Sequence, residues 1–314
     1  MAENTAQIMT AIPGTRSLLF ANLICIASML VWAAGLPAAD MLIGKVPPLI
    51  LTAARTGIAA AVLIPIWIAV EGVGVLSQAR WGLGILIGGT TIGFGALLLV
   101  IGQSMTNAVT VAIVAAASPL IGMALEIILD GRRMTVALLM GLVLSLIGGG
   151  LALRIGGAGA NEVGFGLGAF LCLVSVSVFT LGSRLTVTAF PTLTPLGRTT
   201  ITLTGAAVMT GIAALAHAAT GASGPDWALL GWPELGALAV FAIGGMAISQ
   251  LLWIMSVGQL GIGLASLHIN ATPFYVMLIL FLLGAAWSWP QAVAAAVVGL
   301  GVLVAQGVFS PNRT

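Results

Sequence analysis

Residues 266–278 read SLHINATPFYVML and place several groups that could do chemistry in an otherwise apolar stretch. On an α-helix, positions i, i+4 and i+7 share one face, so we expect His268, Thr272 and Tyr275 to line up. Pro273 removes one backbone N–H and crowds the carbonyl four residues earlier, which kinks a helix. A carbonyl freed in an apolar environment must be satisfied by protein or by a wet cavity. We therefore interpret this face as a cavity wall; the alternative is hydrogen bonding to neighbouring helices.

A second polar face is predicted in another apolar segment, where Ser249, Trp253 and Ser256 share the same spacing. Trp253 and Trp32 both lie too deep in their segments for the interfacial position that indoles prefer. Each either packs as core or offers a cavity a flat wall and one N–H donor. These residues are further candidates for the lining of a binding cavity.

Two arginines lie in apolar segments, where a charge costs roughly 2.5–3.5 kcal/mol on insertion scales. They are Arg55, in PLILTAART at 48–56, and Arg198, in PTLTPLGRT at 191–199. One interpretation is recognition of a substrate carboxylate. The other is that each arginine bonds to backbone carbonyls and holds a helix end, because both are expected nearer an interface than the membrane midplane.

The composition is that of a helical membrane protein with many spans. Of 314 residues, 60% are hydrophobic and 6% are charged, whereas soluble domains have about 25% charged residues. The two cysteines are expected as core residues, and no spacing predicts a metal site, a cofactor or a nucleic-acid interface. Ten apolar runs are each about long enough to cross a bilayer. We place them at 17–39, 47–70, 81–102, 106–129, 134–154, 163–187, 193–218, 233–257, 260–283 and 289–309.

The chain repeats itself in two halves. PLILTAART and PTLTPLGRT share P-x6-R-T, and AAASPL at 115–120 matches INATPF at 269–274. The second match pairs Ser118 with Thr272, so Ser118 is a further candidate for the cavity wall. It also pairs the kinking residue Pro119 with Pro273. We predict five-helix repeats at 17–154 and 163–309, a linker at 155–162 and short tails at 1–16 and 310–314. Because five crossings are an odd number, the second repeat must be inverted, as in many secondary transporters.

Lysine and arginine positions predict the orientation. With the N-terminus in the cytoplasm, the inner side receives six of these residues and the outer side receives Lys45 and Arg154. We therefore expect both tails in the cytoplasm and the chain in a bacterial inner membrane. Nothing in the pattern requires an oligomer, so a monomer is consistent with it.

The chain resembles the ten-helix members of the drug/metabolite transporter superfamily that are built from two EamA-like repeats. The resemblance rests on VWAAG at 31–35, on the arginines of ART and GRT, and on the prolines of ASPL and ATPF. It departs from the family where Gly131-Arg132 and Gly284-Ala285 replace a frequent Gly-Glu. Among the family's members the general pattern is similar to bacterial aromatic amino-acid exporters. The resemblance implies a transporter and not an enzyme.

The leading functional hypothesis is export of a small metabolite, most simply an amino acid, by alternating access. No carboxylate is expected near the membrane midplane, which favours facilitated or weakly coupled export. A lipophilic or quaternary cationic drug is the alternative substrate. A remote alternative is an intramembrane serine protease, since GASG at 221–224 contains a candidate nucleophile, Ser223. That serine falls in a predicted loop, whereas a nucleophile needs a fixed position at the start of a helix.

Overall fold

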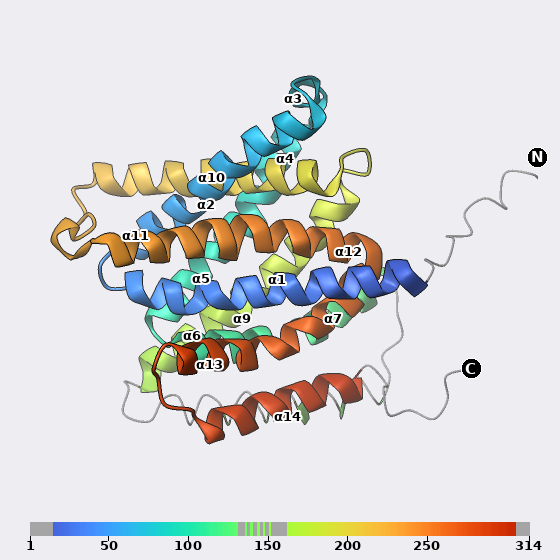
Figure 1. Cartoon of the computed structure of the whole chain (residues 1–314), viewed down its shortest axis with the longest axis vertical. Helices are drawn as coiled ribbons and strands as arrows, with labels where there is room; N and C mark the ends of the chain where they lie inside the picture. Colours follow the sequence, from blue (N-terminus) through green and yellow to red (C-terminus); the bar gives the residue numbers. More distant parts are fainter. Residues whose placement is uncertain are drawn as a thin grey trace, which may run out of the picture.

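The structure, a computed structural model, describes residues 15–130 and 162–305 and seven isolated residues between 136 and 151. Over these residues the protein is all-helical, as the sequence predicts, and its long helices run side by side in one bundle (Figure 1). Most of the predicted helix at 134–154, and nearly all of the linker and the two tails, lie outside the described residues.

Seven described helical segments are long and apolar enough to cross a membrane, and two shorter apolar segments follow them at His268–Leu282 and Trp289–Gly301. The elements are α1 (Thr15–Leu42), α2 (Pro48–Glu71), α3 (Gly74–Gln78), α4 (Trp81–Ile87), η1 (Gly88–Gly93), α5 (Phe94–Ser104), α6 (Ala108–Ala115), α7 (Ser118–Asp130), α9 (Glu162–Thr188), α10 (Pro195–Ala219), η2 (Trp227–Leu229), α11 (Trp232–Ala239), η3 (Val240–Ile248), α12 (Ser249–Ser266), η4 (Leu267–Ala271), α13 (Thr272–Leu282) and α14 (Trp289–Ala305).

Four of the crossings are interrupted, and the interruptions come in matching places. The third crossing of each half contains a π-helical segment, η1 or η3. The fourth crossing is broken directly before each proline: α6 ends at Ala115 and α7 begins at Ser118, while η4 is a 3₁₀ helix that ends where α13 begins. A proline in the first turn of a helix is well tolerated, because the N–H that it lacks has no helical partner there.

The eighth and ninth crossings meet at a glycine. Gly261 has a φ of 76°, a left-handed conformation that a side chain would oppose, and it ends the helix that starts in α12. The predicted turn at 257–260 therefore lies slightly later in the chain. The ninth crossing then passes through the 3₁₀ turns of η4, which leaves a shorter continuous α-helix than the sequence predicts.

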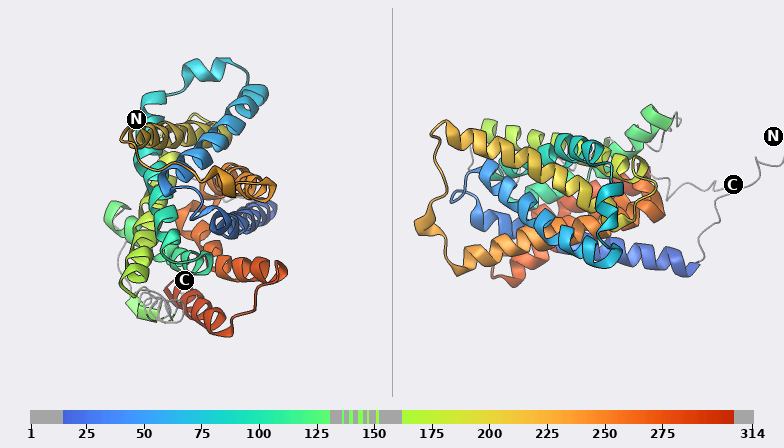
Figure 2. Two further views of the ribbon diagram at one scale, coloured as in Figure 1. Left: turned by 90° about the vertical axis from the view of Figure 1, so that its left-hand side faces the viewer. Right: turned by 90° about the horizontal axis from the view of Figure 1, so that it is seen from above.

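Helices of the two halves pack on each other in corresponding pairs. α1 packs on η3 and α12 as α9 packs on η1 and α5, and α2 packs on η3 as α10 packs on η1. α2 and α10 pack on each other, and so do α6 and α13. Figure 2 shows the bundle from two further directions, one of them along the helices. The first turn of α1 and the end of α14 lie at the same end of the bundle (Figure 1).

Close backbone approach holds these pairs together at a few glycines. A Cβ on Gly88 would overlap the carbonyl of Thr202, so η1 can lie on α10 only with glycine there. Gly35 of α1 and Gly245 of η3 meet in the same way, since a Cβ on either would lie 3.1–3.2 Å from the Cα of the other. Small residues at helix crossings are how membrane helices gain packing contacts.

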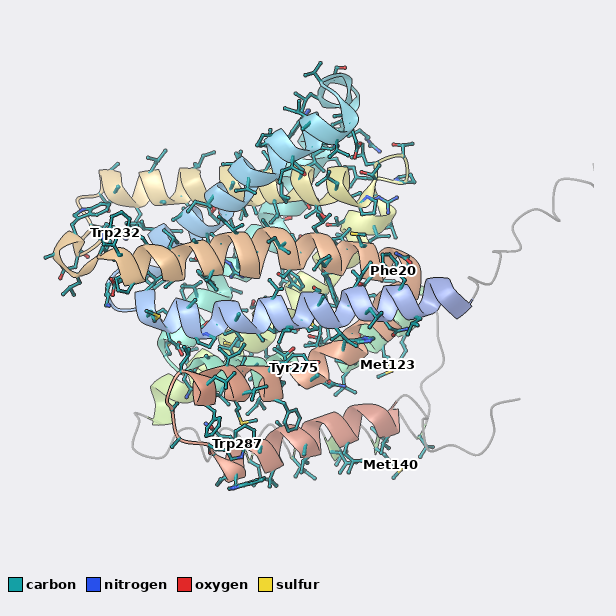
Figure 3. All side chains as sticks on the ribbon, viewed as in Figure 1. Phe20, Met123, Met140, Trp232, Tyr275 and Trp287 are labelled. Carbon is teal, nitrogen blue, oxygen red and sulfur yellow. The ribbon has the colours of Figure 1, made fainter. Side chains whose placement is uncertain are left out.

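Some helix ends and connections carry exposed aromatic side chains or ion-paired charges. Trp232, labelled in Figure 3, is 86% exposed where α11 begins, as expected of an interfacial indole. Lys45, between α1 and α2, pairs with Glu234 of α11 at 2.7 Å. This ion pair ties the α1–α2 connection to the start of α11.

Candidate functional site

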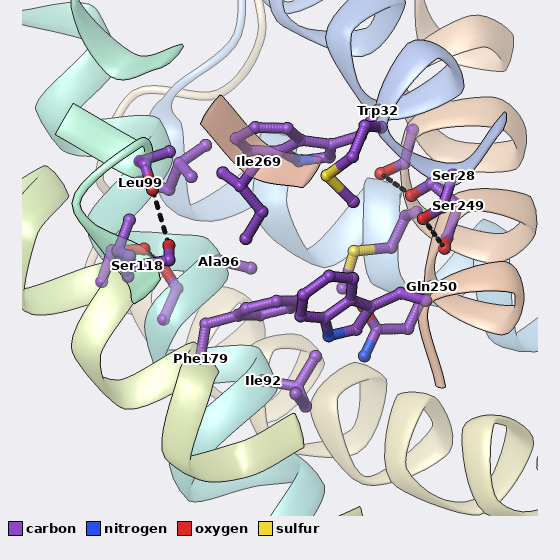
Figure 4. A pocket seen from close by; sticks show the side chains of 18 of the residues that line it. Ser28, Trp32, Ile92, Ala96, Leu99, Ser118, Phe179, Ser249, Gln250 and Ile269 are labelled. Carbon is purple, nitrogen blue, oxygen red and sulfur yellow. Dashed lines mark hydrogen bonds between the residues drawn. The ribbon is translucent and has the colours of Figure 1, made fainter. Parts of the chain in front are cut away.

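A cavity lies between the two halves of the bundle. It includes about 650 Å³ of empty space, counting space that is open to solvent. Its walls come from α1, α2, η1, α5, α6, α7, α9, η3, α12 and η4. Figure 4 shows Trp32 and Phe179 on opposite sides of it, with Ser118 at one end and Ser28, Ser249 and Gln250 at the other.

A buried arginine forms part of the polar end. Arg55 is 3% exposed, and its Nη2 donates to the carbonyl of Gly245 at 3.0 Å. Its guanidinium carbon lies 4.0 Å from the centroid of the Phe241 ring, a cation–π contact. Within the described part of the chain, Arg55 has no carboxylate partner and its Nε has no hydrogen-bond partner. The cavity therefore holds a positive charge with an unused donor.

The carbonyl of Gly245 accepts from two side chains, Arg55 and Ser249. Gly245 lies in the π-helix η3, and Ser249 Oγ also donates to its carbonyl at 2.9 Å. Ser28 Oγ of α1 donates in turn to the carbonyl of Ser249 at 2.7 Å. Next to them, Gln250 is 3% exposed and its Nε2 has no partner in the described residues. This end of the cavity thus presents N–H donors to whatever binds there.

Trp253 is held in the wall by a hydrogen-bond chain. Its Nε1 donates to Ser183 Oγ at 2.9 Å, and Ser183 Oγ donates to the carbonyl of Phe179 at 2.9 Å. Both hydroxyl and indole are buried. The chain fixes one aromatic wall, Trp253, against the helix that carries another, Phe179.

Replacing Ser183 with alanine is expected to leave the indole N–H of Trp253 without its acceptor. Side-chain hydrogen bonds between membrane helices contribute about 0.6 kcal/mol, with a maximum near 1.7. We expect a loss of that size in unfolding free energy, measured in detergent by denaturant titration. Ser177→Ala is the matched control, because the Ser177 hydroxyl is exposed and, among the described residues, donates to the carbonyl of Leu173 of its own helix and to no other helix. Equal losses for both variants would contradict the role of this hydrogen-bond chain.

The lining residues themselves form pairs across the two halves. Sixteen of the nineteen fall into eight pairs at two constant separations in the chain. Pairs from the first crossings are 147 residues apart and pairs from the third and fourth crossings are 154 apart. They are Ser28/Ser175, Met29/Val176, Trp32/Phe179, Ile92/Met246, Gly95/Ser249, Ala96/Gln250, Leu99/Trp253 and Ala115/Ile269. The remaining three are Arg55, Ser118 and Gly245.

This pairing has a sequence signal that is not among the repeat motifs given above. CIASMLVWAAG at 25–35 and CLVSVSVFTLG at 172–182 share C-x2-S-x2-V-aromatic-x2-G. The serines act alike: Ser28 Oγ donates to the carbonyl of Ser249, and Ser175 Oγ donates to that of Gly95 at 2.6 Å. The glycines also act alike, since Gly35 abuts η3 and Gly182 abuts η1.

Five of the residues singled out from the sequence line the cavity: Trp32, Arg55, Ser118, Ser249 and Trp253. Pro119 and Pro273 lie in the first turns of α7 and α13, directly after the breaks described above.

Four other candidates lie outside the lining. His268 is half-buried with Nδ1 3.3 Å from the carbonyl of Ala265, and Ser256 Oγ donates to the carbonyl of Leu252 on its own helix. Thr272 is fully buried. Tyr275, which is labelled in Figure 3, packs against core side chains. The expected face of His268, Thr272 and Tyr275 does not form because residues 267–271 are a 3₁₀ helix with three residues per turn. Ile269 reaches the cavity from this stretch instead.

The two arginines are not equivalent, contrary to the expected pairing. Both helices begin at a proline, α2 at Pro48 and α10 at Pro195. Counted from these starts, Arg55 is the eighth residue of α2 and Arg198 is the fourth residue of α10. The separation of 147 pairs Arg55 with Thr202. Arg198 is half-buried, and its Nε and Nη2 donate to the carbonyls of Phe190 and Pro191 at 2.8 and 3.1 Å. It holds the start of its helix.

Comparison with known proteins gives a family for the first half of the chain. Residues 19–154 match the EamA-like transporter family. The match covers the first predicted repeat. No curated protein matches the chain. Sixteen chains of solved structures are similar to it, and one crystal structure has a TM-score of 0.68 at 23% identity, covering 94% of this chain and 99% of its own. Likeness at that identity shows the fold alone.

Proposed function

We propose that the protein is a secondary transporter that moves small metabolites through the central cavity. The observation that carries the proposal is the buried, positively charged Arg55 in a cavity between membrane-length helices. A charge in such a place is costly, and membrane proteins keep one mainly on a substrate or ion path. The match of residues 19–154 to a transporter family supports the same conclusion.

Alternating access between two inverted repeats, 17–154 and 163–309, is the proposed mechanism. Its support is the eight lining pairs and the corresponding helix contacts, which are what a pseudo-two-fold axis through the cavity would produce. A site on that axis can open to either side when the halves exchange conformations. The interrupted crossings, with their π and 3₁₀ segments, are the natural places for the backbone to bend.

An amino acid with an apolar or aromatic side chain is the proposed substrate, and export is the proposed direction. The guanidinium of Arg55 suits a carboxylate, and Trp32, Phe179 and Trp253 suit an apolar side chain. A cationic drug is disfavoured, because the charged side chain in the described lining is an arginine. The protease alternative is disfavoured as well, since Ser223 is exposed in the α10–η2 connection and not at the start of a helix.

The proposed location is a bacterial inner membrane with both tails in the cytoplasm. The α9–α10 connection, which follows Arg184, lies at the end of the bundle where α1 begins (Figure 1). The α1–α2 connection, which carries Lys45, lies at the other end. A monomer contains the whole proposed cavity.

Counterflow in proteoliposomes tests the substrate directly. Vesicles loaded with unlabelled apolar or aromatic amino acids are expected to accumulate the labelled amino acid well above protein-free vesicles, with and without a proton gradient. Quaternary amines are expected to give no such exchange. Exchange of the amines without the amino acids would replace the leading proposal with the drug-export alternative, and no exchange of either would contradict both.

A further inference from the structure

The backbone at the two ends of the cavity has matching contacts, but the side chains at the two ends differ. At each end a serine of a first crossing donates to a carbonyl of a third crossing: Ser28 to Ser249 at 2.7 Å, and Ser175 to Gly95 at 2.6 Å. Because the backbone is matched, the side chains that differ between paired positions decide what each end can bind.

The arginine end, formed by Arg55, Ser249 and Gln250, is rich in donors. Arg55 Nε and Gln250 Nε2 are both buried without a hydrogen-bond partner in the described residues. A buried donor left unpaired is costly, so a ligand that accepts from both would be favoured. A carboxylate has two acceptor oxygens and a charge opposite to that of the guanidinium, and it meets both requirements.

The small-residue end, formed by Gly95, Ala96, Ser118 and Ser175, has small side chains, and among the described residues both of its hydroxyls already donate to backbone carbonyls. Gly95 and Ala96 replace Ser249 and Gln250 of the arginine end. The hydroxyl of Ser118 donates to the carbonyl of Ala115 at 2.6 Å, and that of Ser175 donates to Gly95. These two hydroxyls therefore offer a ligand oxygen lone pairs and no proton, which disfavours a second carboxylate beside them.

We infer that the bound substrate is a monocarboxylate with its carboxylate at the arginine end and its apolar side chain at the small-residue end, and that Ala96 sets the largest side chain accepted. The inference rests on the proposed transport function and adds an orientation and a residue that determines specificity. It also excludes dicarboxylic amino acids, since their second carboxylate would meet the lone pairs of Ser118 and Ser175.

The side-chain part of the inference is tested by Ala96→Leu. A methylene changes selection in an apolar pocket by about 10-fold or more, so the added bulk should act strongly on large substrates. In counterflow we expect labelled alanine to exchange within about twofold of wild type and labelled tryptophan to fall on the order of 10-fold or more. Labelled glutamate should not be exchanged by either protein.

Gln250→Leu is the matched control, because Gln250 is the repeat mate of Ala96. It removes a donor for the carboxylate that all substrates share, so alanine and tryptophan should lose exchange by the same factor. Retained alanine exchange and an unchanged gel-filtration profile show that Ala96→Leu is folded. Equal loss of alanine and tryptophan with Ala96→Leu, no loss of either, or efficient glutamate exchange overturns the inference. Absence of amino-acid exchange by the wild type instead contradicts the proposed function.

Discussion

Replacing Arg55 with alanine is expected to abolish carboxylate transport while the protein still inserts in the membrane. The guanidinium is the charge that we assign to the substrate carboxylate, and it is 3% exposed. Removing one partner of a desolvated charge contact costs about 2–5 kcal/mol, which is a loss of roughly 30-fold or more in affinity. Counterflow rate against substrate concentration measures it, as a large rise in KM or a rate equal to that of empty vesicles.

Lysine at position 55 separates charge from shape. A lysine keeps a positive charge but lacks the planar, five-donor geometry that can hold a carboxylate and the carbonyl of Gly245 together. We expect Arg55→Lys to restore part of the transport lost in Arg55→Ala. A wild-type KM in the alanine variant would show that the carboxylate is bound elsewhere.

Arg198→Ala is the control for a general effect of losing an arginine. Arg198 donates to the carbonyls of Phe190 and Pro191 and lies outside the cavity lining. Its removal should lower thermal stability, because the carbonyls that precede α10 lose their donors. The KM of the variant for amino acids should not change. An increase in KM equal to that of Arg55→Ala would contradict the separate roles given to the two residues.

Most of the fold could be predicted because hydrophobic length is a strong signal. The second helix of each half was predicted to begin near 47 and 193 and begins at Pro48 and Pro195, since a proline marks the start of a helix. The sequence also predicted a kink at Pro119 and Pro273, and the structure has a break in the α-helix directly before each of them. The predicted turn at 257–260 was placed slightly early because Gly261, with its positive φ, gives no stronger signal than its glycine neighbours.

The site was only partly predictable, for two physical reasons. A helical face at i, i+4 and i+7 assumes 3.6 residues per turn, whereas η4 has three residues per turn. His268 and Tyr275 therefore lie outside the cavity lining, and Ile269 lies in it. Short matches such as P-x6-R-T can also align in the wrong register. The matching backbone contacts of Ser28 and Ser175, together with the start of α2 at Pro48 and of α10 at Pro195, give the register that pairs Arg55 with Thr202.

When the transporter changes state, Thr272 is expected to become exposed to the cavity, and its repeat mate Ser118 is expected to become buried. Ser118 and Thr272 are 154 residues apart, like the paired residues of the third and fourth crossings, but Ser118 lines the cavity and Thr272 does not. Thr272 is 0% exposed, and its Oγ1 has no partner in the described residues. If the halves exchange conformations, Thr272 gains a wet environment that satisfies this hydroxyl, and Ser118 loses it.

Cysteine labelling measures that exchange. In a background with Cys25 and Cys172 replaced, Ser118→Cys and Thr272→Cys are each treated with a hydrophilic thiol reagent, with substrate on one side of the membrane or the other. We expect the two labelling rates to change in opposite directions when the substrate gradient is reversed. Thr186→Cys is the control, because Thr186 is also 0% exposed with an unpartnered hydroxyl but lies outside the cavity lining, so it should stay unreactive throughout. Rates that rise and fall together in a protein that still transports would mean that the halves do not exchange conformations, and that Thr272 belongs to the core in both states.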